Sequence, residues 1–324
     1  MFWPIVLFLA GFVLLIKGGD WFVDGSVALA RRFHLPELLI GATVVSIGTT
    51  LPEVMVSSQA ALEHNAGISY GNAIGSIICN TSLIAALTVA IRPGKVSPRS
   101  FLYPTLFFFA AALSYAAVAW TSGRFDRWIG ILYLCVFVFY MLWSVRYMKK
   151  HPDAAEDAGE DAEKEDPKPL WQEILLLVLG AAAIAVGARL LVDNGTKIAQ
   201  ALGVPDSVIG LTMIALGTSL PELITAITSL VKGHGALSLG NVIGANLFNI
   251  ILVSGAAITL SPFSVPAEKM IGGMNSSLII DLPLMLAVMA VLCVPTLATG
   301  KLKRWQGILL LGVYAAFTVY QFVS

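Results

Sequence analysis

Long apolar stretches, separated by short breaks rich in charge, Pro or Gly, dominate the chain. A bilayer core is crossed by about 20 mostly apolar residues in a helix, because the backbone must satisfy its own hydrogen bonds there. Ten stretches fit this requirement, and we predict a membrane helix for each. They cover residues 3–30, 37–62, 68–91, 101–121, 128–147, 170–199, 207–231, 236–260, 277–298 and 305–323.

The composition supports a membrane protein. Apolar residues make up 57% of the chain and charged residues only 12%, whereas a soluble domain carries about 25% charged residues. We therefore predict an all-α polytopic protein whose surroundings are a lipid bilayer. A formal net charge of zero, without a basic patch interleaved with aromatic residues, argues against nucleic acid as a partner. The sequence indicates neither a cofactor nor an obligate protein partner.

The distribution of Lys and Arg predicts an orientation. With the N-terminus outside, 14 of the 20 basic residues fall in inside loops, four in outside segments and two within spans. Because cytoplasmic loops carry the excess of positive charge, both termini are expected outside. Residues 149–169 hold four Lys and eight Asp or Glu, and we predict that they form a charged cytoplasmic linker.

The chain contains an internal repeat. Residues 11–80 align with residues 180–249 at a constant offset of 169 without a gap, and 20 of the 70 positions are identical. The identities include Pro, Asp, Asn and Glu, which apolar composition alone would not align. Residues 1–148 and 170–324 each contain five predicted spans, and an odd number inverts the second copy in the membrane. Two inverted five-helix repeats are typical of secondary transporters with a midplane site.

The second and seventh spans carry related motifs, GTTLPE at residues 48–53 and GTSLPE at residues 217–222. Pro52 has no N–H to donate to the carbonyl of Gly48, and its ring crowds that turn. We therefore expect the helix to break just before Pro52, and the copy to break at Gly217 before Pro221.

Each motif places one carboxylate in the middle of a span, Glu53 in the first copy and Glu222 in the second. An ionised carboxylate at the bilayer centre costs about 2.5–3.5 kcal/mol unless it is compensated. A protonated Glu that links helices is the alternative, which the duplication disfavours. Freed carbonyls and hydroxyl groups beside the carboxylates are the oxygen ligands that Ca²⁺ and Na⁺ prefer. The hydroxyl groups belong to Thr49, Thr50, Thr218 and Ser219.

The third and eighth spans carry GNAIGS at residues 71–76 and GNVIGA at residues 240–245. Their GxxxG spacing predicts close approach to neighbouring helices. Ser76 and Asn80 are four residues apart and share a helix face, as do Ala245 and Asn249. We expect this face to meet the Glu pair and complete the ligand set. For the Asn residues at positions 72 and 241, packing or hydrogen bonding is as plausible as ion binding.

These motifs resemble the cation/calcium exchanger superfamily, and specifically the prokaryotic sodium/calcium antiporters. Both copies match in order, so the resemblance covers essentially the whole chain. It implies that Glu53 and Glu222 are central ligands shared by Ca²⁺ and Na⁺, and that the long first and sixth spans slide across the core. It further implies flanking ligands from Thr49, Thr218, Ser76 and the backbone carbonyls of Ser46 and Ala215, with Asn80 and Asn249 as the midplane pair.

Two positions depart from the family pattern. Some members carry Asp where this chain has Asn249, and Ser where it has Ala245. The site therefore offers two negative charges instead of three, which leaves the number of sodium ions open. Proton-coupled relatives carry a GNAxE-type sequence at the position of the GT(T/S)LPE motif, so sodium coupling is favoured.

The expected function is exchange of Na⁺ for Ca²⁺ by alternating access in the cell membrane of a prokaryote. A proton- or potassium-coupled exchanger of the same fold is the first alternative, and a cation channel is the second. Residues 67–71 fit the GxSxG pattern of hydrolases, but the copy has Ala236 at the first Gly and all four His lie in predicted loops. We therefore expect no enzyme.

Overall fold

The computed structural model describes residues 2–150, 169–203, 217–267 and 270–323. Most of the described chain is α-helical, with several single π-helical turns, labelled η, inside longer helices. The first half contains α1 (Phe2–Arg32), α2 (Glu37–Ile40), η1 (Gly41–Val45), α3 (Ser46–Leu62), α4 (Ala66–Cys79), η2 (Asn80–Ala85), α5 (Ala86–Ile91), α6 (Pro98–Ser122), β1 (Arg124–Phe125) and α7 (Arg127–Lys150).

The second half follows a similar order. It contains α8 (Leu170–Ala201), α11 (Leu220–Val231), α12 (Gly235–Phe248), η5 (Asn249–Ser254), α13 (Gly255–Leu260), β2 (Phe263–Ser264), β3 (Met270–Ile271), β4 (Met274–Asn275), η6 (Ser277–Asp281), α14 (Leu282–Thr299) and α15 (Arg304–Val323). The predicted linker 149–169 lies almost wholly outside the described residues.

Eight of the ten predicted membrane helices are confirmed by the described structure. Within the described ranges, eight helical segments are long and apolar enough to cross a membrane, and they coincide with eight of the ten predicted stretches. The seventh stretch is described only from Gly217 onward and includes the 12-residue helix α11. The tenth is the 20-residue helix α15. The all-α polytopic fold class is therefore correct.

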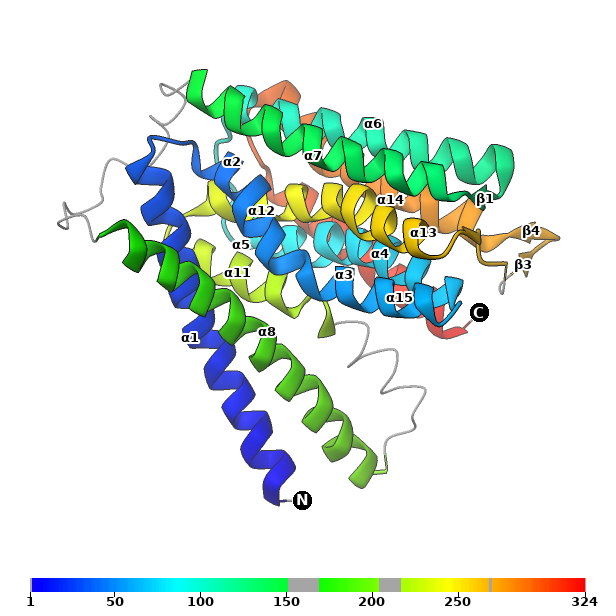
Figure 1. Cartoon of the computed structure of the whole chain (residues 1–324), viewed down its shortest axis with the longest axis horizontal. Coiled ribbons are helices and arrows are strands. Elements are labelled where there is room, and N and C mark those ends of the chain that lie inside the picture. Colours follow the sequence, from blue (N-terminus) through cyan, green and yellow to red (C-terminus); the bar gives the residue numbers. More distant parts are fainter. Residues whose placement is uncertain (1, 151–168, 204–216, 268–269, 324) are drawn as a thin grey trace.

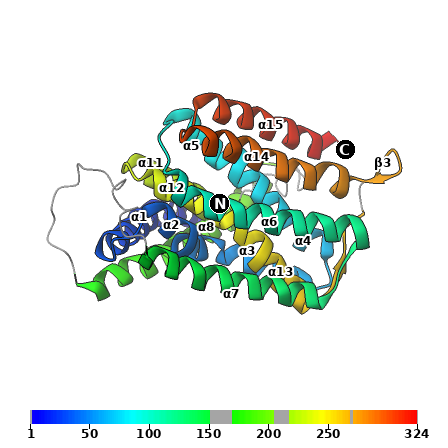
Figure 2. The same ribbon diagram turned by 90° about the horizontal axis from the view of Figure 1, so that it is seen from above.

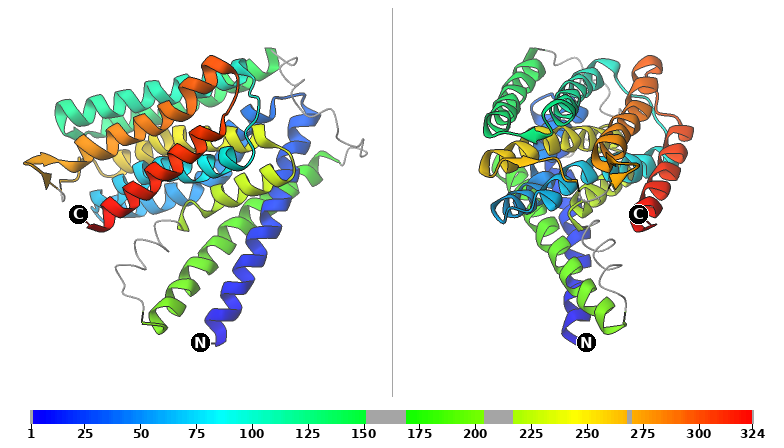
Figure 3. Two further views of the ribbon diagram at one scale, coloured as in Figure 1. Left: turned by 180° about the vertical axis from the view of Figure 1, so that it is seen from behind. Right: turned by 90° about the vertical axis from the view of Figure 1, so that its right-hand side faces the viewer.

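Most helices run side by side in one bundle, while α1 and α8 form a pair that leans away from it (Figure 1). Seen from above, α7 lies on one flank and α14 and α15 on the other, with α3, α4 and α13 between them (Figure 2). The two further views show the α1–α8 pair projecting below the bundle (Figure 3). The main apolar core lies within the bundle, and a smaller one joins α1, α8 and the start of the second span.

Glycine residues at repeat-equivalent positions let α1 and α8 cross closely. A Cβ added to Gly180 would lie 2.4 Å from the backbone nitrogen of Phe22, and one added to Gly18 would lie 2.8 Å from the backbone nitrogen of Ile184. Gly11 and Gly187 meet in the same way, since a Cβ on either would lie 2.8 Å from the other's carbonyl oxygen. The crossing therefore requires glycine on both helices.

The GxxxG spacing has the predicted role in the second copy. A Cβ on Gly240 would lie 2.0 Å from the carbonyl oxygen of Leu38, and one on Gly244 would lie 2.3 Å from Ser46 Oγ. No described atom lies within 4 Å of the Cβ position of Gly71. The segment equivalent to 38–46 in the other repeat is 207–215, which is not among the described residues.

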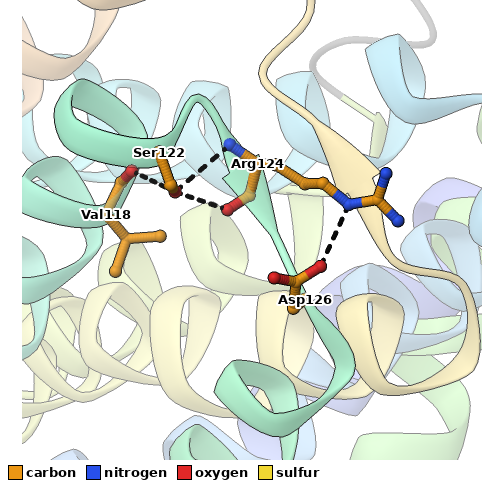
Figure 4. Close-up of polar contacts among 4 residues, drawn as sticks. All are labelled: Val118, Ser122, Arg124 and Asp126. Carbon is orange, nitrogen blue, oxygen red and sulfur yellow. Dashed lines mark hydrogen bonds and ion pairs between the residues drawn. The ribbon is translucent and has the colours of Figure 1, made fainter.

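A compact turn joins α6 to α7 at one end of the bundle (Figure 4). Gly123 has a φ of +62°, and the hydroxyl of Ser122 lies 2.8 Å from the carbonyl oxygens of both Val118 and Arg124. Arg124 Nε then contacts Asp126 Oδ1 at 3.0 Å. Strand β1 pairs antiparallel with β2. Two connections that we predicted to lie on the outside therefore meet at this end.

Ion pairs hold the opposite end of the bundle together. Arg32 at the end of α1 binds both carboxylate oxygens of Glu173 at the start of α8, at 2.7 and 3.0 Å. Lys232, directly after α11, lies 2.7 Å from Asp24 Oδ1 and 3.4 Å from Asp20 Oδ1 on α1. The connections involved are all predicted to lie inside, so the structure gathers them on one face.

The predicted helix break is wrong for the first motif and correct for the second. Helix α3 runs through Pro52 without interruption, and the irregular turn lies earlier, at the π-helical η1. A π-helical turn absorbs one extra residue without ending the helix. In the second motif the helix is interrupted at Thr218 and Ser219, and Pro221 lies in the first turn of α11. Proline is well tolerated in a first turn because no intrahelical partner is lost there.

Replacing Gly180 by Val should separate α1 from α8. The added side chain would overlap the backbone of Phe22, and such overpacking typically costs about 1–3 kcal/mol. The expected result is a lower midpoint of thermal unfolding in detergent. Gly312→Val on α15 is the matched control, since no described atom lies within 4 Å of its Cβ position. Equal midpoints for the two variants would contradict the close crossing.

Candidate ion-binding site

Two carboxylates at repeat-equivalent positions form the centre of the candidate site. Glu53 lies on α3 and Glu222 in the first turn of α11, and both side chains are fully buried. The helices that carry them, α3 and α11, contact each other. Each helix also contacts a π-helical turn of the other repeat, α3 with η5 and α11 with η2. Elements of both repeats therefore meet at the helices that carry the two Glu residues.

Both π-helical turns begin at the asparagines that we predicted to lie at the midplane. Asn80 is the first residue of η2, and Asn249, 169 positions later, is the first residue of η5. Both side chains are fully buried. A π-helical turn widens the helix locally and is common at functional sites. Here each π-helical turn contacts the helix that carries the Glu of the other repeat.

Several buried polar side chains at and near the two carboxylates lack hydrogen-bond partners, and they occur at equivalent positions of the two repeats. Among the described residues, no partner exists for the side-chain oxygens of Thr50 and Ser219, Glu53 and Glu222, or for the amides of Asn80 and Asn249. Leaving one buried polar group unsatisfied costs about 1–3 kcal/mol, and more for a charged group. Within the described residues, these three repeat-related pairs of buried, unpartnered side chains therefore indicate a site that binds a polar ligand.

The asparagines at positions 72 and 241 have structural contacts. Asn241 accepts a hydrogen bond from Thr49 Oγ1 at 3.1 Å, and its backbone carbonyl accepts one from Ser46 Oγ at 3.0 Å. Asn72 donates to the carbonyl oxygen of Glu53 at 3.2 Å and to Ser57 Oγ at 2.9 Å. Of the two roles left open by the sequence, the structure shows hydrogen bonding between helices.

The remaining predicted ligands are placed unequally. Thr49, Ser46 and Ser76 are buried, with Ser76 one helical turn before Asn80. Thr218 is only half-buried and lies in the interruption before α11. Ala215 lies outside the described residues. The first repeat therefore contributes its predicted residues as buried groups, while the second is described only from Gly217.

The long helices α1 and α8 cover the two motifs from one side. A Cβ on Gly48 would lie 2.9 Å from the ring of Phe22 on α1, and a Cβ on Gly217 would lie 2.6 Å from a methyl group of Val192 on α8. A cavity of about 10 Å³ lies between these helices and is bordered by Thr49. Such a volume holds about one water molecule. In this structure the carboxylates are thus closed off from solvent.

One buried polar contact was not predicted from the sequence. Asn246 donates to Thr81 Oγ1 at 2.8 Å and lies 3.2 Å from the sulfur of Met289. Position 246 corresponds to Ile77 in the first copy, so this contact is not duplicated. Comparison of the two copies therefore could not predict this contact. The one sequence feature that pointed to it was a polar residue, Asn246, within an apolar span.

The donor set suits a hard cation. Carboxylate, hydroxyl, amide and carbonyl oxygens bind Ca²⁺ and Na⁺, whereas soft or transition metals favour sulfur and imidazole. In the part of the chain that the structure describes, no group of three or more His, Cys, Asp or Glu residues could hold a metal ion. The three cysteines are free thiols. The arrangement thus offers a cation two carboxylates and neutral oxygens as ligands.

Replacing Asn249 by Leu should stabilise the ion-free protein and remove its response to Ca²⁺. The Asn249 amide has no partner within the described chain, so its loss should raise the free energy of unfolding by about 1–3 kcal/mol. Asn241→Leu is the control, because it removes the side-chain oxygen that accepts hydrogen bonds from Thr49 and Ser46 and should destabilise. Thermal unfolding with and without Ca²⁺ checks both. A Ca²⁺-dependent shift retained in Asn249→Leu would exclude Asn249 as a ligand.

Known proteins match this chain over nearly its whole length. The family model described as "Sodium/calcium exchanger protein" matches residues 3–146 and 173–323. The sodium/calcium exchanger MaX1 of Methanosarcina acetivorans is 31% identical over 98% of each chain. An uncharacterized membrane protein of Methanocaldococcus jannaschii is 38% identical over 95% of this chain and 94% of its own.

A solved structure matches the fold. The sodium-calcium exchanger NCX_Mj, soaked with 2.5 mM Na⁺ and 10 mM Sr²⁺, superimposes with a TM-score of 0.78 at 34% identity, covering 97% of each chain. The family model, these full-length relatives and the arrangement of the two repeats agree. The chain belongs to the sodium/calcium exchanger family.

Proposed function

We propose that this protein exchanges Na⁺ for Ca²⁺ across a membrane at a site between its two repeats. The observation that carries the proposal is the set of repeat-related, buried and unpartnered groups around Glu53 and Glu222. The proposed ligands are those predicted from the sequence, with the two carboxylates central and the hydroxyl, amide and carbonyl oxygens around them. The related sodium/calcium exchanger MaX1 and the NCX_Mj structure with its Na⁺ and Sr²⁺ soaks support the choice of ions.

The charge of the site explains why transport would be an exchange. Two ionised carboxylates at the bilayer centre cost about 5–7 kcal/mol together, from about 2.5–3.5 kcal/mol each. One Ca²⁺ or two Na⁺ would neutralise both. An empty, doubly charged site is then far less able to cross between the two facing states than a loaded one. Transport of one kind of ion across the membrane therefore requires that the other kind binds and is carried back.

The α1–α8 pair is the element best suited to switch access. The two helices contact each other far more than they contact the bundle, and they cover both motifs through Phe22 and Val192. Their close crossing at glycine residues joins the two helices to each other. We propose that the pair moves as one body and opens the site alternately to each side.

We further propose that the end holding Arg32, Lys232 and Lys301 faces the cytoplasm. The predicted inside loops gather there, and the excess of Lys and Arg favours that side. Both termini then lie outside, residues 149–169 form a cytoplasmic linker between repeats 1–148 and 170–324, and the membrane is the cell membrane of a prokaryote. The prokaryotic relatives support the last point.

Glu53→Gln and Glu222→Gln should each abolish Na⁺-driven ⁴⁵Ca²⁺ uptake into proteoliposomes. Each change removes half of the negative charge that would bind Ca²⁺, so we expect uptake to fall at least about a hundredfold, as for loss of a charged hydrogen-bonding group. Flux in either variant at the level of the unchanged protein would sink the proposal.

Glu63→Gln is the matched control for these variants. Glu63 follows the same helix α3 but is exposed and contacts only Gln59 in the described structure, so full uptake is expected. Imposing Na⁺, K⁺ and H⁺ gradients one at a time separates the alternatives. Uptake driven by K⁺ or H⁺ alone would favour the other couplings, and uptake without any counter-ion would favour a channel.

Single cysteines should report the orientation. In a background lacking the cysteines at positions 79, 135 and 293, Arg124→Cys should react with a membrane-impermeant maleimide in intact cells. Lys301→Cys should react only after the cells are opened, because it lies at the opposite end. Both side chains are exposed, so labelling depends only on whether the maleimide can reach that side of the membrane. The reverse pattern would overturn the proposed topology.

A further inference from the structure

A second polar cavity lies at the end of the bundle opposite the β1–β2 pair. It has a volume of about 900 Å³ and lies between the ends of several helices and the loops that connect them. Glu37, which borders the cavity, lies 16 residues before Glu53 along one nearly continuous helix. At about 1.5 Å per residue this corresponds to about 24 Å. The cavity is therefore separate from the ion-binding site.

The wall of the cavity carries an excess of positive charge. The basic residues that border it are Arg31, Arg92, Lys95, Lys232 and Lys301. Among its bordering residues the one carboxylate is that of Glu37, which contacts His234 Nδ1 at 2.9 Å. Lys232 is already paired with Asp20 and Asp24. Four basic side chains thus face the cavity without a carboxylate in the described contacts.

Two of these lysines are held side by side by the backbone. Lys95 and Lys301 lie opposite each other in an antiparallel bridge, flanked by hydrogen bonds from Val96 N to Gly300 O and from Leu302 N to Gly94 O. This is the non-hydrogen-bonded type of pair, in which side chains are closest. Like charges directly opposite each other are unfavourable. A multiply charged anion between them would remove that repulsion.

Two helices also begin at this cavity. Residues of the first turns of α6 and α12 border it, and neither helix begins with a side-chain hydrogen-bond cap. The N–H groups and the dipole at a helix start favour an anion. The helices have 25 and 14 residues, so each is long enough to carry a helix dipole whose positive end lies at the cavity.

Buried hydroxyl groups in these same first turns lack a partner. Ser100 on α6 and Ser238 on α12 border the cavity, and each side chain is only 2% exposed. Neither hydroxyl has a hydrogen-bond partner within the described residues. Nearby hydroxyls usually bond back to their own helix, as Thr88 does to Ala85. Ser100 and Ser238 are thus donors available to a ligand.

From these four features we propose that the cavity binds a phosphate group, carried by a soluble phosphate compound or by an anionic lipid. The lysine pair and the arginines supply charge, while the helix starts and the two hydroxyls supply directed donors. Phosphate offers several acceptor oxygens and about two negative charges, which matches this donor set. Basic pockets between membrane helices on the cytoplasmic side are suited to lipid headgroups. The proposal is independent of which cations are exchanged.

Titration calorimetry on the full-length protein in an uncharged detergent tests this site. The probes are pyrophosphate for a soluble source, short-chain phosphatidylglycerol for a lipid source, and short-chain phosphatidylcholine as the headgroup control. We expect saturable binding of pyrophosphate or phosphatidylglycerol that exceeds binding of phosphatidylcholine. Binding confined to phosphatidylglycerol identifies a lipid site, and binding of pyrophosphate identifies one open to soluble compounds.

Matched variants separate this site from general charge attraction. Lys95→Gln and Lys301→Gln should each weaken binding at least about tenfold, as expected for a charge-assisted contact. Lys303→Gln, two residues away but not bordering the cavity, should not. Ser238→Ala should weaken binding, whereas Ser69→Ala should not, since Ser69 is its buried, unpartnered repeat equivalent away from the cavity.

An unchanged Ca²⁺-dependent thermal shift in each variant shows that it is folded and that the ion site is intact. If one lysine variant fails this check, the other lysine and Ser238→Ala still test the site. Absence of saturable binding for both phosphate probes would overturn the proposal. Equal losses in Lys303→Gln and Lys301→Gln, or in Ser69→Ala and Ser238→Ala, would overturn it as well.

Discussion

The structure depends on the cost of placing two carboxylates in a medium that cannot solvate them. Glu53 and Glu222 are fully buried within membrane helices and have no hydrogen-bond partner among the described residues. A protein that only needed stability would replace them with apolar side chains, because buried charge rarely stabilises a fold. Their retention in both repeats, together with unpartnered hydroxyls and amides, makes sense if a cation supplies the missing interactions during transport.

Irregular helix geometry follows from that requirement. A regular helix satisfies its own carbonyls and directs side chains at fixed angles, so it offers few ligands. Here π-helical turns begin at Asn80 and Asn249, and the helix before Glu222 is interrupted at Thr218 and Ser219. Around this irregular centre the glycines of α1 and α8 allow a close crossing, which covers the motifs without locking them. Stability comes from the bundle, while the site and its cover deviate from regular packing.

Among the described residues, equivalent positions of the two repeats make different contacts. Asn72 bonds within its own repeat, to Glu53 and Ser57, whereas Asn241 bonds to Ser46 and Thr49 of the other repeat. Two inverted copies that made identical contacts would present the site equally to both sides. Different contacts made by equivalent residues are what an alternating-access protein requires in any one state. Exchange of these contacts between the copies would describe the opposite state.

The sequence by itself determined the membrane class, most helix positions, the repeat and the two carboxylates, because hydropathy and an ungapped duplication are local properties of the chain. It also led us to expect, from their spacing, that Asn80 and Asn249 face the Glu pair. It could not determine that α3 continues through Pro52, that Asn241 holds Thr49, or that Lys95 lies opposite Lys301. These features arise where segments distant in sequence meet. The local sequence allows several geometries of similar free energy, and the tertiary contacts select one of them. Only the tertiary structure could decide them.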